Sequence, residues 1–177
     1  MYSSFKFFQK SLFVAIAMAV LVGGSFNCRS SADANNKQLA NQFFKPWANH
    51  IVKTSGAPDT MPVYQQFFFR YDNGTFDRAI LAYESVPDDQ RTPDMAFFYA
   101  NALSKMGKTA EAADIFSALI EMKASQFDGH ARWYLALADL KMGKTADSRQ
   151  ILTAISQEPN NYFYEKAKEL LGKMGGE

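Results

Sequence analysis

The hexapeptide KMGKTA occurs twice in this chain of 177 residues, at 105–110 and again at 141–146. Each copy contains Gly-Lys-Thr, the end of a phosphate-binding loop, so the duplication marks either two phosphate sites or the seam of a structural repeat. The phosphate loop requires another glycine five residues before the Gly-Lys pair and a strand that leads into it. Those two positions hold Ala102 and Ala138, both within helical patterns. The duplication therefore predicts a structural repeat.

Glycine marks the same kind of turn three times, at Gly74, Gly107 and Gly143. The interval of about 35 residues falls in the range that is typical of helical repeats. A glycine just past the end of a helix adopts the left-handed conformation without the steric penalty of a Cβ atom. We therefore predict that Gly107 and Gly143 have positive φ and end helices, and that Thr109 and Thr145 cap the helices that follow.

The residues after each of these glycines also agree in size. The fifth residue after each glycine is small, the ninth is large and the twelfth is aliphatic. In that order they are Ala79, Ala112 and Ser148, then Tyr83, Phe116 and Leu152, then Val86, Leu119 and Ile155. A small residue lets two helices approach closely, and a large one fills the groove beside it. This shared register predicts three helix pairs of one kind.

The rest of the pattern is helical, with no convincing strand. Apolar residues recur at helical spacing over 60–72, 76–86, 92–106, 109–123, 125–142, 145–157 and 161–171. Thr92 followed by Pro93 predicts a capped helix start. Ahead of these, 40–53 has helical offsets that Pro46 interrupts, which predicts a kinked or broken helix. We predict an all-α chain with a leader and linker at 1–34, an N-terminal helical segment at 35–57, and a helical array with a C-terminal capping helix at 58–177.

The array contains YQQFFFRYDNGTFDRAILAYESV, AFFYANALSKMGKTAEAADIFSALIEM and ARWYLALADLKMGKTADSRQILTAISQEPN. These stretches resemble the tetratricopeptide repeat, a unit of two antiparallel helices. The third has Leu135 and Ala136 where the family has a leucine and a small residue, whereas Gln66 and Phe67 replace that pair in the first. The resemblance covers roughly 60–158. It implies a helix-turn-helix solenoid of about three repeats, closed by a solvating end helix.

The resemblance also implies a binding surface, because the first helix of each pair lines a concave groove in this family. Residues three or four apart share that face. The corresponding residues here are Tyr64, Phe68, Tyr71, Phe97, Asn101, Lys105, His130, Trp133, Leu137 and Lys141. Aromatic anchors beside polar groups suit recognition of a peptide or protein, although any one aromatic has core packing as its alternative role. The basic and Asn pattern that clamps a peptide carboxylate in chaperone-binding relatives is absent except for Asn101.

A basic and apolar leader precedes the array. Lys6 and Lys10 come before the uncharged stretch SLFVAIAMAVLVGGSF. Its apolar part, 12–22, spans about 16 Å as a helix against the ~30 Å of a hydrocarbon core, which favours a signal peptide over a permanent anchor. Lipidation of Cys28, the only cysteine, is a third possibility, with a partial match to a lipoprotein signal. The leader therefore predicts export to the periplasm, or a membrane anchor with the chain facing the periplasm.

Little in the chain suggests catalysis. His50 and His130 are far apart, no Gly-x-Ser-x-Gly motif is present, and a single cysteine makes neither a disulfide nor a zinc site. A formal net charge of +1 gives no electrostatic basis for nucleic-acid binding. We expect no enzyme activity, no cofactor, and membrane contact only through the N-terminal segment. The sequence predicts a non-catalytic protein-interaction scaffold on the outer side of a bacterial cytoplasmic membrane; the alternative is a membrane-anchored regulatory or envelope-assembly component.

Overall fold

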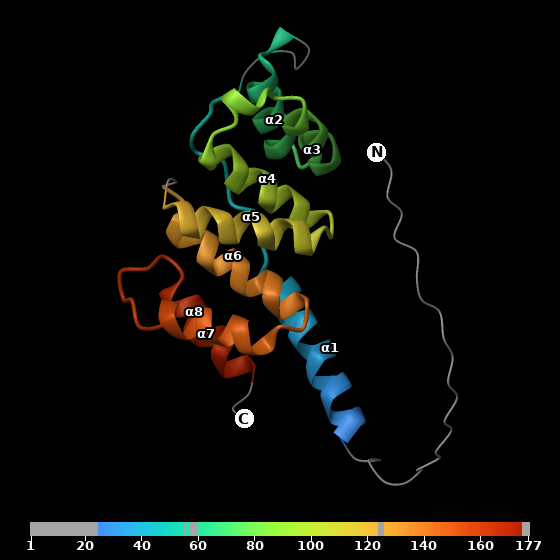
Figure 1. Ribbon diagram of the computed structural model, residues 1–177, viewed down its shortest axis with the longest axis vertical. Helices are drawn as coiled ribbons and strands as arrows, with labels where there is room; N and C mark the ends of the chain where they lie inside the picture. The colour runs from blue at the N-terminus through green and yellow to red at the C-terminus, as the bar shows by residue number, and fades with distance from the viewer. Residues whose placement is uncertain (1–24, 55, 57–59, 124–125, 175–177) are drawn as a thin grey trace, which may run out of the picture.

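The computed structural model describes residues 25–54, 56, 60–123 and 126–174, with side chains from residue 31 onward. Within this part the chain forms eight α-helices and no strand (Figure 1). The helices are α1 (Ser25–Phe43), α2 (Val63–Asp72), α3 (Phe76–Glu84), α4 (Pro93–Lys105), α5 (Thr109–Met122), α6 (Asp128–Lys141), α7 (Thr145–Ile155) and α8 (Tyr164–Lys173). The prediction of an all-α chain is confirmed for the described residues.

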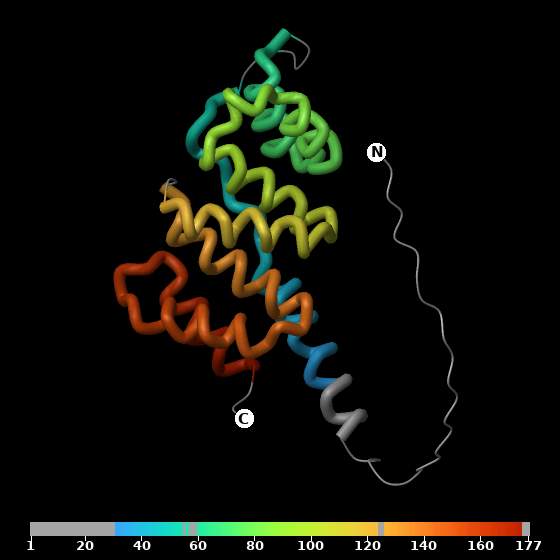
Figure 2. Tube along the Cα trace, in the orientation of Figure 1, coloured from blue at the N-terminus to red at the C-terminus, as the bar shows by residue number. Residues whose placement is uncertain are grey.

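The helices from α2 to α8 stack in chain order, each one in contact with the next (Figure 1). Helix α1 lies at the end of this stack that is far from α2, where it contacts α6 and α8. From there the chain returns to α2 across the stack as the teal segment of Figure 2. The N-terminal part therefore touches both ends of the helix stack.

The leader falls largely outside this description. Residues 1–24 and the side chain of Cys28 lie outside the described part, so the signal, anchor and lipidation predictions concern regions that the structure does not describe. Helix α1 begins at Ser25, within the range predicted for the leader and linker. Among the described helices, none is both long and apolar enough to cross a membrane.

The three repeated glycines end helices in the same way. Gly107 and Gly143 each have a φ of 81°, which confirms the left-handed turns predicted there, and Gly74 has the same conformation with a φ of 71°. At the last of these turns the amide of Lys144 donates to the carbonyl of Asp139 at 2.8 Å, and the amide of Gly143 donates to the carbonyl of Leu140 at 3.2 Å. This pair of bonds is the Schellman motif, which satisfies carbonyls at the end of α6.

The predicted threonine caps are wrong. Lys108 and Lys144 occupy the N-cap positions of α5 and α7, without a side-chain hydrogen bond to the helix. The glycine turn is so tight that the residue straight after the glycine already serves as the cap, which places each threonine inside the first helical turn. Thr145 instead accepts a hydrogen bond from Asn36 of α1 at 3.2 Å. By contrast, Thr92 caps α4 as predicted, since it accepts from the amide of Met95.

The repeated size pattern corresponds to buried positions. All nine register residues are buried, and the small ones at the fifth position, Ala79, Ala112 and Ser148, are fully buried. The hydroxyl of Ser148 has no hydrogen-bond partner among the described residues. The sequence register therefore identified core positions of α3, α5 and α7, one of which holds an unsatisfied polar group.

The structure differs most from the prediction after Phe43. Helix α1 ends there, and residues 44–54, which we call the strap, form no helix or strand. Pro46 explains this ending, because a proline disfavours the helical conformation of the residue before it and lacks an amide donor. Helices α6 and α8 also begin three residues later than predicted, at Asp128 and Tyr164.

Candidate functional site

The strap crosses α2, α4 and α6, and we call the face of these helices beneath it the inner face. Its main chain is held there by side chains. The hydroxyl of Tyr134 on α6 donates to the carbonyl of Lys45 at 2.7 Å. The hydroxyl of Tyr71 on α2 donates to the carbonyl of Trp47 at 2.8 Å. The amide of Trp47 donates to Oδ1 of Asn101 on α4 at 3.3 Å. Each of the three helices thus contributes one bond to the strap main chain.

Asn101 is fixed in the orientation that this contact needs. Its side chain is fully buried, and its Nδ2 donates to the carbonyl of Phe97 one turn earlier at 2.9 Å. With the amide nitrogen so engaged, Oδ1 is the atom available to accept from the strap. Asn101 therefore acts as an oriented acceptor for a main-chain amide.

The two tyrosine hydroxyls are also held as donors. Tyr71 and Tyr134 are 4% and 3% exposed. Burial raises the pKa of both hydroxyls well above the usual range, because the charged phenolate would lose its hydration. Both groups consequently stay protonated at any physiological pH and donate to carbonyl oxygens.

Aromatic rings surround the indole of Trp47. The ring centroid lies 4.4 Å from that of His130, 5.0 Å from that of Tyr162 and 5.9 Å from that of Phe163, each in edge-to-face geometry. Such pairs add to the stabilisation that comes from burial alone. Burial lowers the pKa of His130, so its imidazole is neutral near pH 7. Trp47 therefore sits in an aromatic cage, and the ammonium group of Lys166 lies over two of its rings, 5.8 Å from the centroid of Tyr162 and 5.6 Å from that of Phe163.

The other end of the strap is tied to α2. Nδ2 of Asn49 donates to Oδ2 of Asp72 at 3.0 Å and to the carbonyl of Val52 at 2.7 Å. Its Oδ1 accepts from the amides of Ile51 and Val52 at 3.0 and 3.1 Å. Asn49 thus forms a local turn that ends the extended part of the strap.

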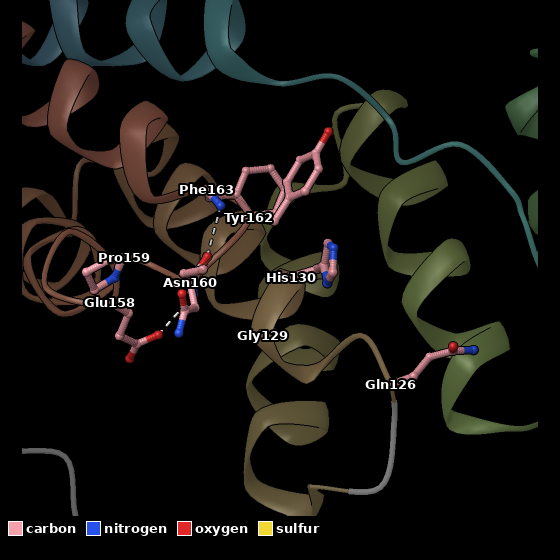
Figure 3. Close-up of a pocket in the computed structure, with 9 residues that line it drawn as sticks. Gln126, Gly129, His130, Glu158, Pro159, Asn160, Tyr162 and Phe163 are labelled. Atoms are coloured by element: carbon pink, nitrogen blue, oxygen red, sulfur yellow. Dashed lines mark hydrogen bonds between the residues drawn. The ribbon is translucent and has the colours of Figure 1, made fainter.

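An open hollow of about 630 Å³ adjoins the cage (Figure 3). It is lined by His130 and Tyr162, together with Gln126, Gly129, Phe163 and the turn 158–161. In Figure 3 the Tyr162 ring extends toward the teal ribbon of the strap. Tyr162 is 66% exposed, so one wall of the cage is accessible from solvent.

An ion pair braces the turn beside this hollow. The guanidinium of Arg132 binds both carboxylate oxygens of Glu158, at 2.8 and 2.7 Å. Glu158 also accepts from Nδ2 of Asn161 at 3.0 Å. These hydrogen bonds, that from Arg132 first, lower the pKa of Glu158 to about 2. Because the two-bond geometry fixes both side chains, the turn that carries Tyr162 is held against α6.

The predicted groove residues divide into four groups. Tyr71, Asn101 and His130 contact the strap, as described above. Phe68, Phe97 and Trp133 lie in the core, each at most 1% exposed, as the alternative role for aromatics foresaw. Leu137 and Lys141 line a small cavity beside α1, and Tyr64 and Lys105 are exposed. The structure brings the first group together at the strap, and Tyr64 lines a separate hollow with Ile51 and Val52 of the strap.

Three contributors were missing from the sequence prediction: Tyr134, Trp47 and Tyr162. Tyr134 lies four residues after His130, and residues at that spacing share one face of a helix, so this signal could have found it. For Trp47 the available signal was the preceding Pro46, because a proline favours an extended segment over a helix. No sequence signal pointed to Tyr162, since it lies in a turn outside the repeated register.

Within the described ranges, no three His, Cys, Asp or Glu side chains gather closely enough to hold a metal ion. The chain matches no protein-family model, and comparison with curated proteins and with solved structures finds no match. Function is therefore inferred from the geometry of the inner face.

Proposed function

We propose that this chain is a non-catalytic scaffold for protein–protein interaction that binds an extended segment of a partner protein on its inner face. The helices from α2 to α7 would form about three tetratricopeptide-like repeats, with α8 as the capping helix. In such an array the first helix of each pair faces the groove, and these helices are α2, α4 and α6.

One observation carries the proposal: this face already holds an extended segment, the strap, through its main chain. Tyr71, Asn101 and Tyr134 each bind a main-chain atom, and main-chain bonds provide affinity for an extended peptide whatever its side chains are. The aromatic cage around Trp47 adds a pocket for one large side chain. Main-chain bonds combined with such a pocket are a common basis of peptide recognition.

The leader completes the proposal. An exported or membrane-anchored chain would present this face on the outer side of a bacterial cytoplasmic membrane, in the periplasm. A second candidate is a regulatory or envelope-assembly component that stays at the membrane through an uncleaved or lipidated leader. Cys28, with its partial match to a lipoprotein signal, is the residue that favours that candidate. The mass of the protein recovered from membranes distinguishes the two, because cleavage shortens the chain and lipidation lengthens it by known masses.

Site-specific photo-crosslinking tests the proposal in the cells that produce the protein. A benzophenone amino acid replaces Tyr162 at the rim of the cage, and a matched control places it at Leu81 of α3, which is 64% exposed. We expect a defined partner segment to crosslink at 162 and not at 81, with the adduct located by mass spectrometry. Equal crosslinking at both positions, or none at 162, would contradict the proposal.

A further inference from the structure

Three polar groups project onto the strap from an inner face that is otherwise largely aromatic. The hydroxyls of Tyr71 and Tyr134 and the Oδ1 of Asn101 all bind main-chain atoms. A buried polar group costs stability unless it is hydrogen-bonded, and phenylalanine would pack in the tyrosine positions without that cost. These three groups are therefore suited to holding an extended main chain rather than to packing helices together.

The strap forms the outer layer of this arrangement. No residue of 44–54 is fully buried, whereas the three side chains that bond its main chain are between 0% and 4% exposed. Each helix from α2 to α8 contacts its neighbour in the chain directly. Departure of the strap would consequently leave the helix stack assembled, while it uncovers the part of the core against which Phe44, Trp47 and Val52 pack.

We propose that the strap is a cis-bound stand-in for the partner segment, and that this segment has the pattern aromatic–X–Pro–aromatic found at 44–47. The inference rests on the proposed function, because it names the kind of segment that the inner face binds. Partner and strap then compete for one site, so the full chain binds its partner only when the strap has left.

Each position of the pattern follows from a contact. The ring of Phe44 packs edge-to-face on that of Tyr134, with centroids 5.8 Å apart. The side chain of Lys45 is exposed, so only its carbonyl is recognised and any residue fits. Pro46 offers no amide, and it favours an extended conformation of the residue before it.

The last position is the most demanding. Trp47 uses its amide, its carbonyl and its ring, the last within the cage of His130, Tyr162 and Phe163. A residue here needs a free amide, which excludes proline, and a large aromatic side chain, which fills the cage. The aromatic residue that follows the proline is thus the anchor of the segment.

Competition has a quantitative consequence. The strap is tethered beside its site, and a short tether gives an effective concentration on the order of millimolar. The apparent Kd of a partner segment equals its intrinsic Kd divided by the fraction of molecules with the site free. A change that loosens the strap and leaves the inner face intact must therefore tighten binding in trans.

A fluorescein-labelled peptide that copies 41–54 tests this by fluorescence anisotropy, with the full chain in detergent. We expect the Trp47→Ala protein to bind the peptide roughly tenfold or more tightly than the wild type, because the vacated site is free for a larger fraction of the time. A peptide with alanine in place of tryptophan should bind neither protein measurably. Leu81→Ala, a change on the exposed surface of α3, is the matched control and should behave as the wild type.

Circular dichroism establishes that the helices are intact in each variant. If Trp47→Ala loses its helices, Asn49→Ala decides, because it removes the bond to Asp72 and loosens the strap from its other end. Equal peptide affinity of wild type and loosened variant overturns the inference, and so does equal binding of the two peptides. A partner could still crosslink at position 162, to the same extent in the wild type and in these variants. That result would leave the proposed function standing while the inference fails.

Discussion

Replacing Tyr134 with phenylalanine removes one hydroxyl and keeps the ring. The ring packs near Phe44, Phe97 and Phe116, with centroid distances of 5.8, 5.6 and 5.5 Å, so the core keeps its shape. What is lost is the 2.7 Å hydrogen bond to the carbonyl of Lys45. A typical intramolecular hydrogen bond contributes about 0.5–1.5 kcal/mol to stability.

The loss should fall near the middle of that range. The bond is partly buried, so the carbonyl of Lys45 loses this donor, while phenylalanine brings no polar atom of its own that would need a partner. A loss of about 1 kcal/mol lowers the Tm of a chain of this size by roughly 2–4 °C. The loss concerns the strap, so the strap should also spend more time away from the inner face.

Acrylamide quenching of tryptophan fluorescence measures that second effect. The chain has two tryptophans, and Trp133 is only 1% exposed, so quenching reports mainly on Trp47 in the strap. We expect both a lower Tm and a larger quenching constant in Tyr134→Phe.

The matched control is Tyr99→Phe, which removes a 3.0 Å hydrogen bond to Glu84 at an exposed position away from the strap. Its quenching constant should equal that of the wild type. An unchanged quenching constant in Tyr134→Phe would refute the assignment of its hydroxyl to the strap, whatever the change in Tm.

Three further predictions concern the frame around the site. Gly143→Val forces a β-branched residue to a φ of 81° and should cost at least about 1 kcal/mol, so an unchanged melting curve contradicts the turn assignment. The control Gly172→Ala adds a Cβ that meets nothing within 4 Å beyond its chain neighbours and its own helix backbone, and it should leave the Tm equal or higher. Ser148→Ala removes a buried hydroxyl without a partner and should raise the Tm, so a fall would indicate a bond that the structure does not show. Glu158 has a pKa lowered from 4.5 to about 2, so its contribution to stability is present above pH 4.5 and is lost as the pH falls toward 2. In urea titrations at pH 7, Glu158→Gln should be less stable than the wild type. A difference in unfolding free energy that stays constant down to pH 2 would count against the ion pair.

The frame of the fold was predictable because its signals are local. The glycine turns follow from backbone sterics at single residues, and the buried register follows from side-chain size at fixed spacing. The capping prediction failed at Thr109 for an equally local reason. The Schellman turn uses the glycine and the following lysine, so the helix starts one residue earlier than the threonine rule assumes.

The candidate site was predictable only in part, because it depends on contacts between distant residues. Tyr134 and Lys45 are 89 positions apart, and no periodicity in either segment encodes their pairing. The helical offsets of Phe43, Phe44 and Trp47, which Pro46 interrupts, favoured a broken helix. The contacts that hold the extended strap come from three other helices. The resemblance to the tetratricopeptide repeat therefore placed Tyr71, Asn101 and His130 on one face without revealing that the chain itself covers it.

A reversible crosslink between the strap and α2 tests the central claim most directly. In a Cys28→Ser background, Asn49→Cys and Asp72→Cys replace two side chains that lie 3.0 Å apart, and a short bis-methanethiosulfonate linker joins them. The linked full chain should fail to bind the labelled 41–54 peptide, and a reductant should restore binding. Equal binding by the linked and the reduced chain would show that the strap does not occupy the peptide site.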